Sequence, residues 1–126
     1  MQAKPGNLFE TVLTPQSGAV PGLAVLEIRG FLDARAITEF DEDAQRYPDD
    51  GFTRLILDSH DLAYISSAGI GALMRLSQNL AQLGGEIVFL PPPSKIYAIF
   101  ELLDFTKVLK FVETKEQALD MLRAKG

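Results

Sequence analysis

The middle of the chain reads RLILD at residues 54–58, SSAGIGALMRLSQNLAQLGG at 66–85 and EIVFL at 86–90. The first and third stretches hold consecutive apolar residues, as buried strands of a parallel sheet do. Between them, apolar side chains recur every three or four residues, which predicts a helix over Ala68–Leu83 that ends on Gly84-Gly85. Two buried strands joined by a helix predict an α/β fold.

The segments before residue 54 predict a strand pair and a first helix. Residues Ala24–Arg29 alternate between apolar and polar, so we expect a strand there that ends at Gly30. A first strand around Phe9–Thr14 is expected to pair with it across a turn rich in Pro, Gly and Ser. Asp33 is placed to cap the helix that follows, which residues 48–51 should stop.

The segments around and after the central unit predict further helices and one short strand. Residues 59–66 are expected to form a loop. Ser94, after three prolines, is placed to cap a short helix, and residues 110–112 should form a last strand. Thr114 and Gln117 have the spacing of a capping box for the final helix. The expected architecture is a mixed central sheet packed with about four to five α-helices.

Length and composition indicate how many domains the chain forms and exclude several classes of protein. The chain has 126 residues, of which 47% are hydrophobic, so we expect a single domain over residues 1–126. No apolar run approaches the ~20 residues that cross a bilayer, and residues 1–9 lack the apolar core of a secretory leader, so the cytoplasm is the expected location. The absence of cysteine excludes disulfides and thiolate sites. A net charge of −5 disfavours nucleic acid and anionic lipid as partners.

The stretch Ile65-Ser66-Ser67-Ala68-Gly69 is where a serine nucleophile would be sought. A nucleophile elbow has glycine two residues before and two residues after its serine, and only the second glycine is present here. The single histidine, His60, precedes these serines, whereas the base of an α/β-hydrolase follows its nucleophile. We therefore expect no enzyme activity and no catalytic residues.

Phosphate and metal motifs are incomplete. The stretch Gly69-Ile70-Gly71 starts like a dinucleotide fingerprint, but Met74 stands where the third glycine should be, so close packing of helix on sheet is the simpler interpretation. Five carboxylates between residues 41 and 50 lack the spacing of a calcium loop and suit a solvated helix face. No metal and no cofactor is expected.

The pair Ser66-Ser67 has two interpretations, and physical chemistry leaves both open. A serine before a helix commonly caps it by accepting a backbone N–H. The same helix start has unpaired N–H groups and the positive end of the helix dipole, so it can also receive a phosphoryl group without disrupting the fold.

Two stretches carry a family resemblance, RGFLDA at residues 29–34 and the run from RLILD at 54 to ETKEQAL at 113–119, with its Gly-Gly pair and its LLDF segment. They give the chain from about Ala24 onward a resemblance to the STAS domain of bacterial anti-sigma-factor antagonists. It implies the STAS fold and a protein that binds partners without being a catalyst.

The resemblance also implies a modified residue and a binding surface. In that family an Asp-Ser-Ser-Gly run opens the helix, and the serine just after the Asp is phosphorylated. That serine falls on Ser67 here, while Ser66 replaces the acidic residue and is the second choice for the modification. The partner-binding residues that the resemblance implies are Asp33, Asp58, Ser59, Ser66, Ser67, Ala68 and Gly69.

The family's role implies two protein partners. The unmodified protein would bind an anti-sigma factor that is also a serine kinase and would thereby free a sigma factor for transcription. Phosphorylation by that kinase would inactivate the protein, and a serine phosphatase would reset it. The alternative is a STAS subunit that is not phosphorylated and that holds another bacterial assembly together, such as a lipid-transport ATPase or a stress-sensing scaffold.

Overall fold

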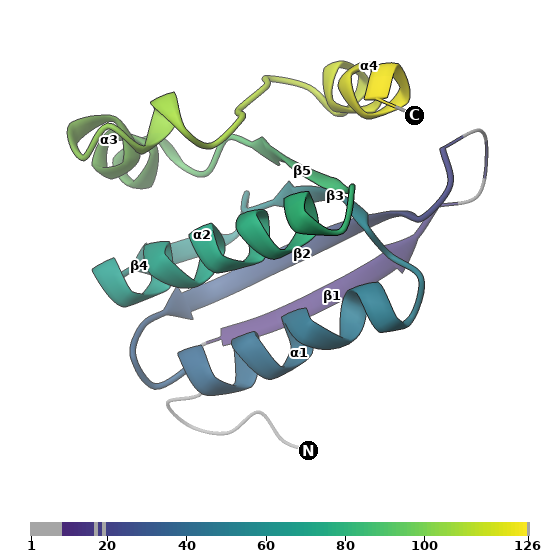
Figure 1. Cartoon of the computed structure of the whole chain (residues 1–126). Coiled ribbons are helices and arrows are strands. Elements are labelled where there is room, and N and C mark those ends of the chain that lie inside the picture. Colours follow the sequence, from purple (N-terminus) through teal and green to yellow (C-terminus); the bar gives the residue numbers. More distant parts are fainter. Residues whose placement is uncertain (1–8, 17, 19, 126) are drawn as a thin grey trace.

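The computed structural model describes residues 9–16, 18 and 20–125, whose backbone forms one mixed sheet with four α-helices (Figure 1). The strands are β1 (Phe9–Pro15), β2 (Leu23–Leu32), β3 (Arg54–Asp58), β4 (Leu62–Ile65) and β5 (Glu86–Leu90). The helices are α1 (Ile37–Asp49), α2 (Ser67–Gln82), α3 (Ser94–Leu102) and α4 (Lys115–Lys125), with a short 3-10 helix, η1 (Phe105–Lys107), after α3. The predicted α/β fold with a mixed sheet and four to five helices is confirmed. The expected lack of a leader concerns residues 1–8, which lie outside the described part, as do residues 17 and 19 of the predicted turn.

Strand β2 is the centre of the sheet. β1 pairs with it antiparallel, as predicted, while β3 and then β4 run parallel to it on its other side. β5 continues the sheet parallel to β3. Because β4 and β5 point the same way, α2 and α3, which follow them, both begin at the carboxyl edge of the sheet (Figure 1).

Helices pack on both faces of the sheet. Helices α1 and α2 cover one face, and the apolar side chains buried there include Leu26, Ile28, Leu55, Leu57, Phe40, Leu73 and Leu80. On the other face, Ala118 and Leu122 of α4 are buried in a second cluster with Ile56 of β3 and Val88 of β5. Figure 1 shows α4 beside β5 and away from β4, so α4 covers only part of that second face.

Two predictions about the middle of the chain are wrong, and both concern the sheet. β2 does not end at Gly30 but runs to Leu32, and the expected loop over 59–66 contains β4, which pairs with that extension. Gly30 has a φ of +87°, and the register between β2 and β4 shifts at this point. The glycine therefore marks a β-bulge, where the partner of β2 changes from β3 to β4.

The starts of α1 and α3 also differ from expectation. Asp33 does not cap α1, because its Oδ1 accepts the N–H of Arg35 at 3.0 Å in the turn before the helix, and Ala36 is the N-cap. Ser94 is the first residue of α3 rather than its cap, because Pro93 is already at the N-cap in an extended conformation. Asp33 thus stabilises the turn before α1, and Ser94 lies inside the first turn of α3.

The central and last elements follow the sequence closely. The helix predicted over Ala68–Leu83 is α2, shifted by one residue at each end, and Gly84 adopts the left-handed conformation with a φ of +80°. The strand predicted over residues 110–112 is reduced to a single bridge between Phe111 and Phe89. Within the described part of the chain, none of the helices combines the length and the apolar character needed to cross a membrane.

Candidate functional site

Ser66 caps α2 and is held by β2. Its φ and ψ of −93° and 171° are extended, and its Oγ accepts the N–H of Gly69 at 3.1 Å. Its own N–H donates to the carbonyl of Leu32 at 3.0 Å, and its hydroxyl donates to the same carbonyl at 3.5 Å. The fold already uses the Ser66 hydroxyl, as the capping interpretation predicts.

Gly69 lets the first turn of α2 lie against β2. A Cβ at this position would stand 2.4 Å from the carbonyl oxygen of Leu32 and 2.8 Å from Cγ1 of Ile65. At Gly71, two residues on, the nearest atom to an added Cβ would be Nη1 of Arg75 at 3.6 Å. The close packing predicted for this stretch is therefore confirmed at Gly69, whose buried position keeps it off the surface.

Ser67 is the first residue of α2, and it is exposed together with Ala68. Among the residues that the structure describes, the Ser67 hydroxyl and the backbone N–H groups of Ser67 and Ala68 have no hydrogen-bond partner. The first turn of α2 has no acidic residue, whereas α1 has Glu39 and α4 has Glu116 in theirs. An exposed hydroxyl thus stands at a positive helix end that no carboxylate of the helix offsets.

The other residues predicted to bind a partner lie at different distances from Ser67. Asp33 is half-buried and directly follows Leu32, the residue that holds Ser66, so it borders the start of α2. Asp58 is opposite Glu27 of β2 in the sheet. Glu27 precedes Asp33 by six residues, and six residues of a straight strand span about 20 Å. Asp58 therefore does not lie next to the start of α2.

Ser59 is not a surface residue. Only 4% of it is exposed, and its Oγ donates to the carbonyl of Leu90 at 3.4 Å. Of the seven residues that the resemblance implied for partner binding, Ser59 and Gly69 are thus buried. A strand-end serine can be exposed or turned inward, and the sequence pattern does not distinguish these two cases.

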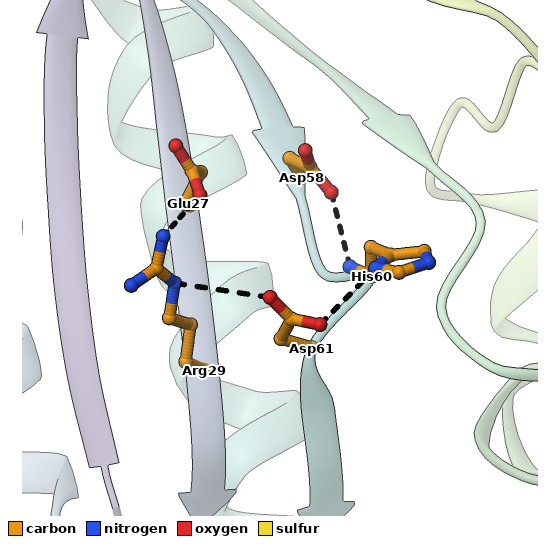
Figure 2. A network of polar contacts seen from close by, with 5 residues as sticks. All are labelled: Glu27, Arg29, Asp58, His60 and Asp61. Atoms are coloured by element: carbon orange, nitrogen blue, oxygen red, sulfur yellow. Dashed lines mark hydrogen bonds and ion pairs between the residues drawn. The ribbon is translucent and has the colours of Figure 1, made fainter.

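A polar network joins the end of β3 to β2 (Figure 2). Nη2 of Arg29 donates to Oε1 of Glu27 at 2.8 Å, and this hydrogen bond raises the pKa of the guanidinium above its ordinary value. Nε of Arg29 is shielded from solvent without a hydrogen bond, with Oδ2 of Asp61 at 3.9 Å. Asp58 accepts the N–H of His60 at 3.0 Å, and Asp61 lies 3.1 Å from Nδ1 of the same histidine. The network ties residues 58–61, and hence the start of β4, to β2.

An aromatic pair that the sequence did not indicate lies between this network and the start of α2. Phe31 of β2 and Tyr64 of β4 are opposite each other in the sheet, with ring centroids 5.9 Å apart. They are 36% and 44% exposed. The pattern of buried Leu62 and Ile65 around exposed Ala63 and Tyr64 departs from simple alternation because of the bulge, so the strand and its aromatic were not recognised.

The arrangement has the chemistry of a binding and acceptor site. The described residues contain no group of three or more His, Cys, Asp or Glu side chains that could hold a metal ion. The side chain of His60 is 84% exposed and contacts Asp61, on a loop that precedes β4 rather than beside the serines. An exposed hydroxyl at a positive helix end is suited to accept a phosphoryl group.

Comparison with known proteins gives this geometry a family context. Residues 14–118 match the family model described as the STAS domain. Over 99 residues the chain is 24% identical to a protein of Bordetella bronchiseptica named "Putative anti-sigma factor antagonist BtrV", covering 79% of this chain and 85% of that protein.

Solved structures share the fold at low sequence identity. An anti-sigma factor antagonist from Mycobacterium paratuberculosis superposes with a TM-score of 0.75 and 17% identity, covering 96% of this chain and 99% of that one. The antagonist SpoIIAA in its unphosphorylated form gives a TM-score of 0.65 and 19% identity, covering 90% and 98% of the two chains. The Bacillus cell fate determinant SpoIIAA in its phosphorylated form gives 0.63 and 18%, covering 90% and 99%.

Proposed function

The chain belongs to the STAS-domain family, and from that membership we propose that it is an anti-sigma-factor antagonist controlled by phosphorylation of Ser67. The unmodified protein binds an anti-sigma factor that is also a serine kinase, which frees a sigma factor for transcription in the cytoplasm. Phosphorylation by that kinase ends the binding, and a serine phosphatase restores it. The protein is a substrate and a binding surface, and it catalyses nothing itself.

One observation carries the choice of residue: of the two adjacent serines, only Ser67 has an exposed hydroxyl that the fold does not use. A phosphate on Ser66 would remove the acceptor of the Gly69 N–H and would have to fit beside the carbonyl of Leu32. A phosphate on Ser67 would meet solvent and the N–H groups of the first turn of α2. The similarity to an antagonist that has been solved in a phosphorylated form supports a modification of this kind.

The phosphoryl transfer is an in-line displacement on ATP bound to the kinase. The Oγ of Ser67 attacks the γ-phosphorus, the bond from that phosphorus to the β,γ-bridging oxygen breaks, and ADP leaves. The hydroxyl proton passes to a base of the kinase, since none of the residues that the structure describes places a base beside Ser67. Hydrolysis by the phosphatase returns the hydroxyl and releases inorganic phosphate.

The added charge acts on binding more than on the fold. A phosphoserine carries roughly −1.5 to −2 charges at neutral pH, and a negative group at a helix start is favourable by ~0.3–1 kcal/mol. At an interface that receives a neutral hydroxyl, the same charge must be desolvated or must face groups not arranged for it. Either costs on the order of several kcal/mol of binding free energy. A loss of about 3 kcal/mol weakens binding more than a hundredfold.

The test is binding of Ser67→Asp and Ser67→Ala to the purified serine kinase of the same organism, with thermal melts of both variants. We expect Ser67→Asp, which has less charge than phosphoserine, to weaken binding at least tenfold, equivalent to about 1.4 kcal/mol, while the melting temperature stays within a few degrees. Ser67→Ala should bind as the unmodified protein does and should not be phosphorylated.

Normal binding by Ser67→Asp together with no phosphate on either serine would contradict the switch. That outcome would favour the alternative, a STAS subunit that holds another assembly together without modification. If Ser67→Asp failed to fold, that result would instead contradict the claim that a negative charge at this position acts on binding and not on the fold.

A further inference from the structure

We infer that the aromatic pair Phe31–Tyr64 and the acidic sheet face beside it form the docking surface for a cationic, arginine-bearing face of the serine kinase. This inference rests on the proposed function, because it says where and by what chemistry the same partner is held next to Ser67. The acidic sheet face is defined by the carboxylates of Glu10, Glu27, Asp58 and Asp61.

The aromatic pair is tied to the start of α2 through the backbone. Tyr64 is three residues before Ser67, so their Cα atoms are at most about 11 Å apart. Phe31 precedes Leu32, whose carbonyl accepts the N–H of Ser66. A partner that covers the Ser67 hydroxyl and has an interface of ordinary size therefore reaches the aromatic pair as well.

The two rings are exposed on the sheet face that lies away from α1 and α2. In β2, Leu26, Ile28 and Leu32 point into the core beneath those helices, so the alternating residues Glu27, Arg29 and Phe31 point the other way. Helix α4 packs on this face against β3 and β5, through a cluster that includes neither Phe31 nor Tyr64. Large aromatic side chains of this kind are the commonest anchors of protein interfaces.

Charge identifies the chemistry of the occupant. The carboxylates of Glu10, Glu27 and Asp61 lie near the guanidinium of Arg29, and Asp58 is opposite Glu27 in the sheet, so these four carboxylates outnumber the one guanidinium among them. A basic partner face would be drawn to it and orientated by it. A guanidinium is the best fit among basic groups, because it can pair with a carboxylate and also stack on the ring of Tyr64.

In the described part of the chain, the other exposed large apolar side chains do not share this setting. Leu102, Leu103 and Val108 are 82%, 50% and 59% exposed, but they follow or end α3 and carry no aromatic ring. Leu83 is 59% exposed at the far end of α2 from Ser67 and is also aliphatic. Leu102 therefore serves as the matched control, since it is an even more exposed apolar residue on a different element.

The first test titrates the full chain with the purified serine kinase of the same organism. We expect Tyr64→Ala to weaken binding about 30-fold, equivalent to about 2 kcal/mol, with Phe31→Ala similar. Tyr64→Phe, which keeps the ring, and Leu102→Ala should each stay within about threefold of the unmodified protein. Binding within threefold for both Tyr64→Ala and Phe31→Ala, in variants whose melts show a folded domain, would overturn the inference, as would an equal loss in Leu102→Ala.

The second test isolates the charge. The double variant Glu10→Gln with Asp61→Asn should slow association about tenfold at low salt, and the difference should shrink as salt screens the charges. The matched double variant Glu116→Gln with Asp120→Asn, on α4, should change association by less than about threefold. Equal effects of the two double variants would contradict a docking role for the acidic sheet face.

The outcomes separate this inference from the proposed switch. If Ser67→Asp weakens binding but Tyr64→Ala does not, the switch stands and the aromatic docking surface is wrong. If Tyr64→Ala weakens binding but Ser67→Asp does not, the docking surface stands and the control by Ser67 is wrong.

Discussion

In the described part of the chain, the starts of α2 and α4 are both capped by a hydroxyl side chain, that of Ser66 and that of Thr114, but the two starts are built differently. At α4 the capping hydrogen bonds are local: Oγ1 of Thr114 accepts the N–H of Gln117 at 3.1 Å, and the Gln117 side chain accepts the N–H of Thr114 at 3.2 Å. At α2 the residue in the place of Gln117 is Gly69, and the N–H of Ser66 donates to Leu32 of β2 instead.

The difference lies in what each start leaves unused. The α4 start closes on its own residues and has Glu116 in its first turn, which complements the helix dipole. The α2 start is held from behind by the sheet and leaves the Ser67 hydroxyl facing solvent without an acidic neighbour in its turn. The first arrangement stabilises a helix, and the second stabilises a helix while leaving an exposed hydroxyl unused.

The largest effect on stability is expected where α2 touches β2. Gly69→Ala would bring a Cβ to 2.4 Å from the carbonyl of Leu32, so we expect a loss of about 3 kcal/mol in the free energy of unfolding, at the upper end for overpacked sites. Gly71→Ala, on the same helix but with 3.6 Å of space, should be neutral or stabilising by up to ~1 kcal/mol. Urea titrations of both variants measure this, and a similar change in the two would mean that the α2 start is not held by the sheet.

A smaller loss is expected when either cap is removed. Ser66→Ala and Thr114→Ala should each lower the free energy of unfolding by ~1 kcal/mol, because each removes the acceptor of one N–H group in the first turn. The neighbouring substitution Ser67→Ala should stay within about ±0.5 kcal/mol. Equilibrium unfolding of the three variants under one condition measures these changes and distinguishes the capping hydroxyl from the exposed one. A larger loss of unfolding free energy in Ser67→Ala than in Ser66→Ala would reverse the roles assigned to the two serines.

The smallest effect is expected from a negative charge at Ser67. Ser67→Asp should raise the free energy of unfolding by ~0.3–1 kcal/mol at low ionic strength, through the dipole of α2. Ser67→Asn, the uncharged match, should lack this gain, and the gain should fade as salt is added. Thermal melts at two salt concentrations measure it, and a clear destabilisation by Asp alone would argue against a positive, uncompensated helix end.

Local signals were enough to predict part of this structure. The capping box of α4 and the helix α2 with its terminal Gly84 depend on residues within a few positions of one another, so their patterns are visible in the chain. The mixed sheet and the number of helices also followed from the alternation of apolar patterns, and the family resemblance agrees with the matched STAS model over residues 14–118.

Features that depend on distant contacts could not be predicted in the same way. Ser66 is fixed by a carbonyl 34 residues earlier in the chain, so the sequence left its role and that of Ser67 open. Strand β4 was missed because the bulge at Gly30 disturbs its alternation, and with it the aromatic residue Tyr64 was overlooked. The inward turn of Ser59 likewise depends on Leu90 of another strand.

The central claim is that the hydroxyl presented at the start of α2, and not the one that caps it, receives the phosphate. Mass spectrometry of the full chain after incubation with the purified serine kinase and ATP tests this most directly, with Ser66→Ala beside the unmodified protein. The account predicts one phosphate on Ser67 in both proteins. Phosphate on Ser66 alone, or on neither serine while the kinase is active on itself or on another substrate, would contradict it.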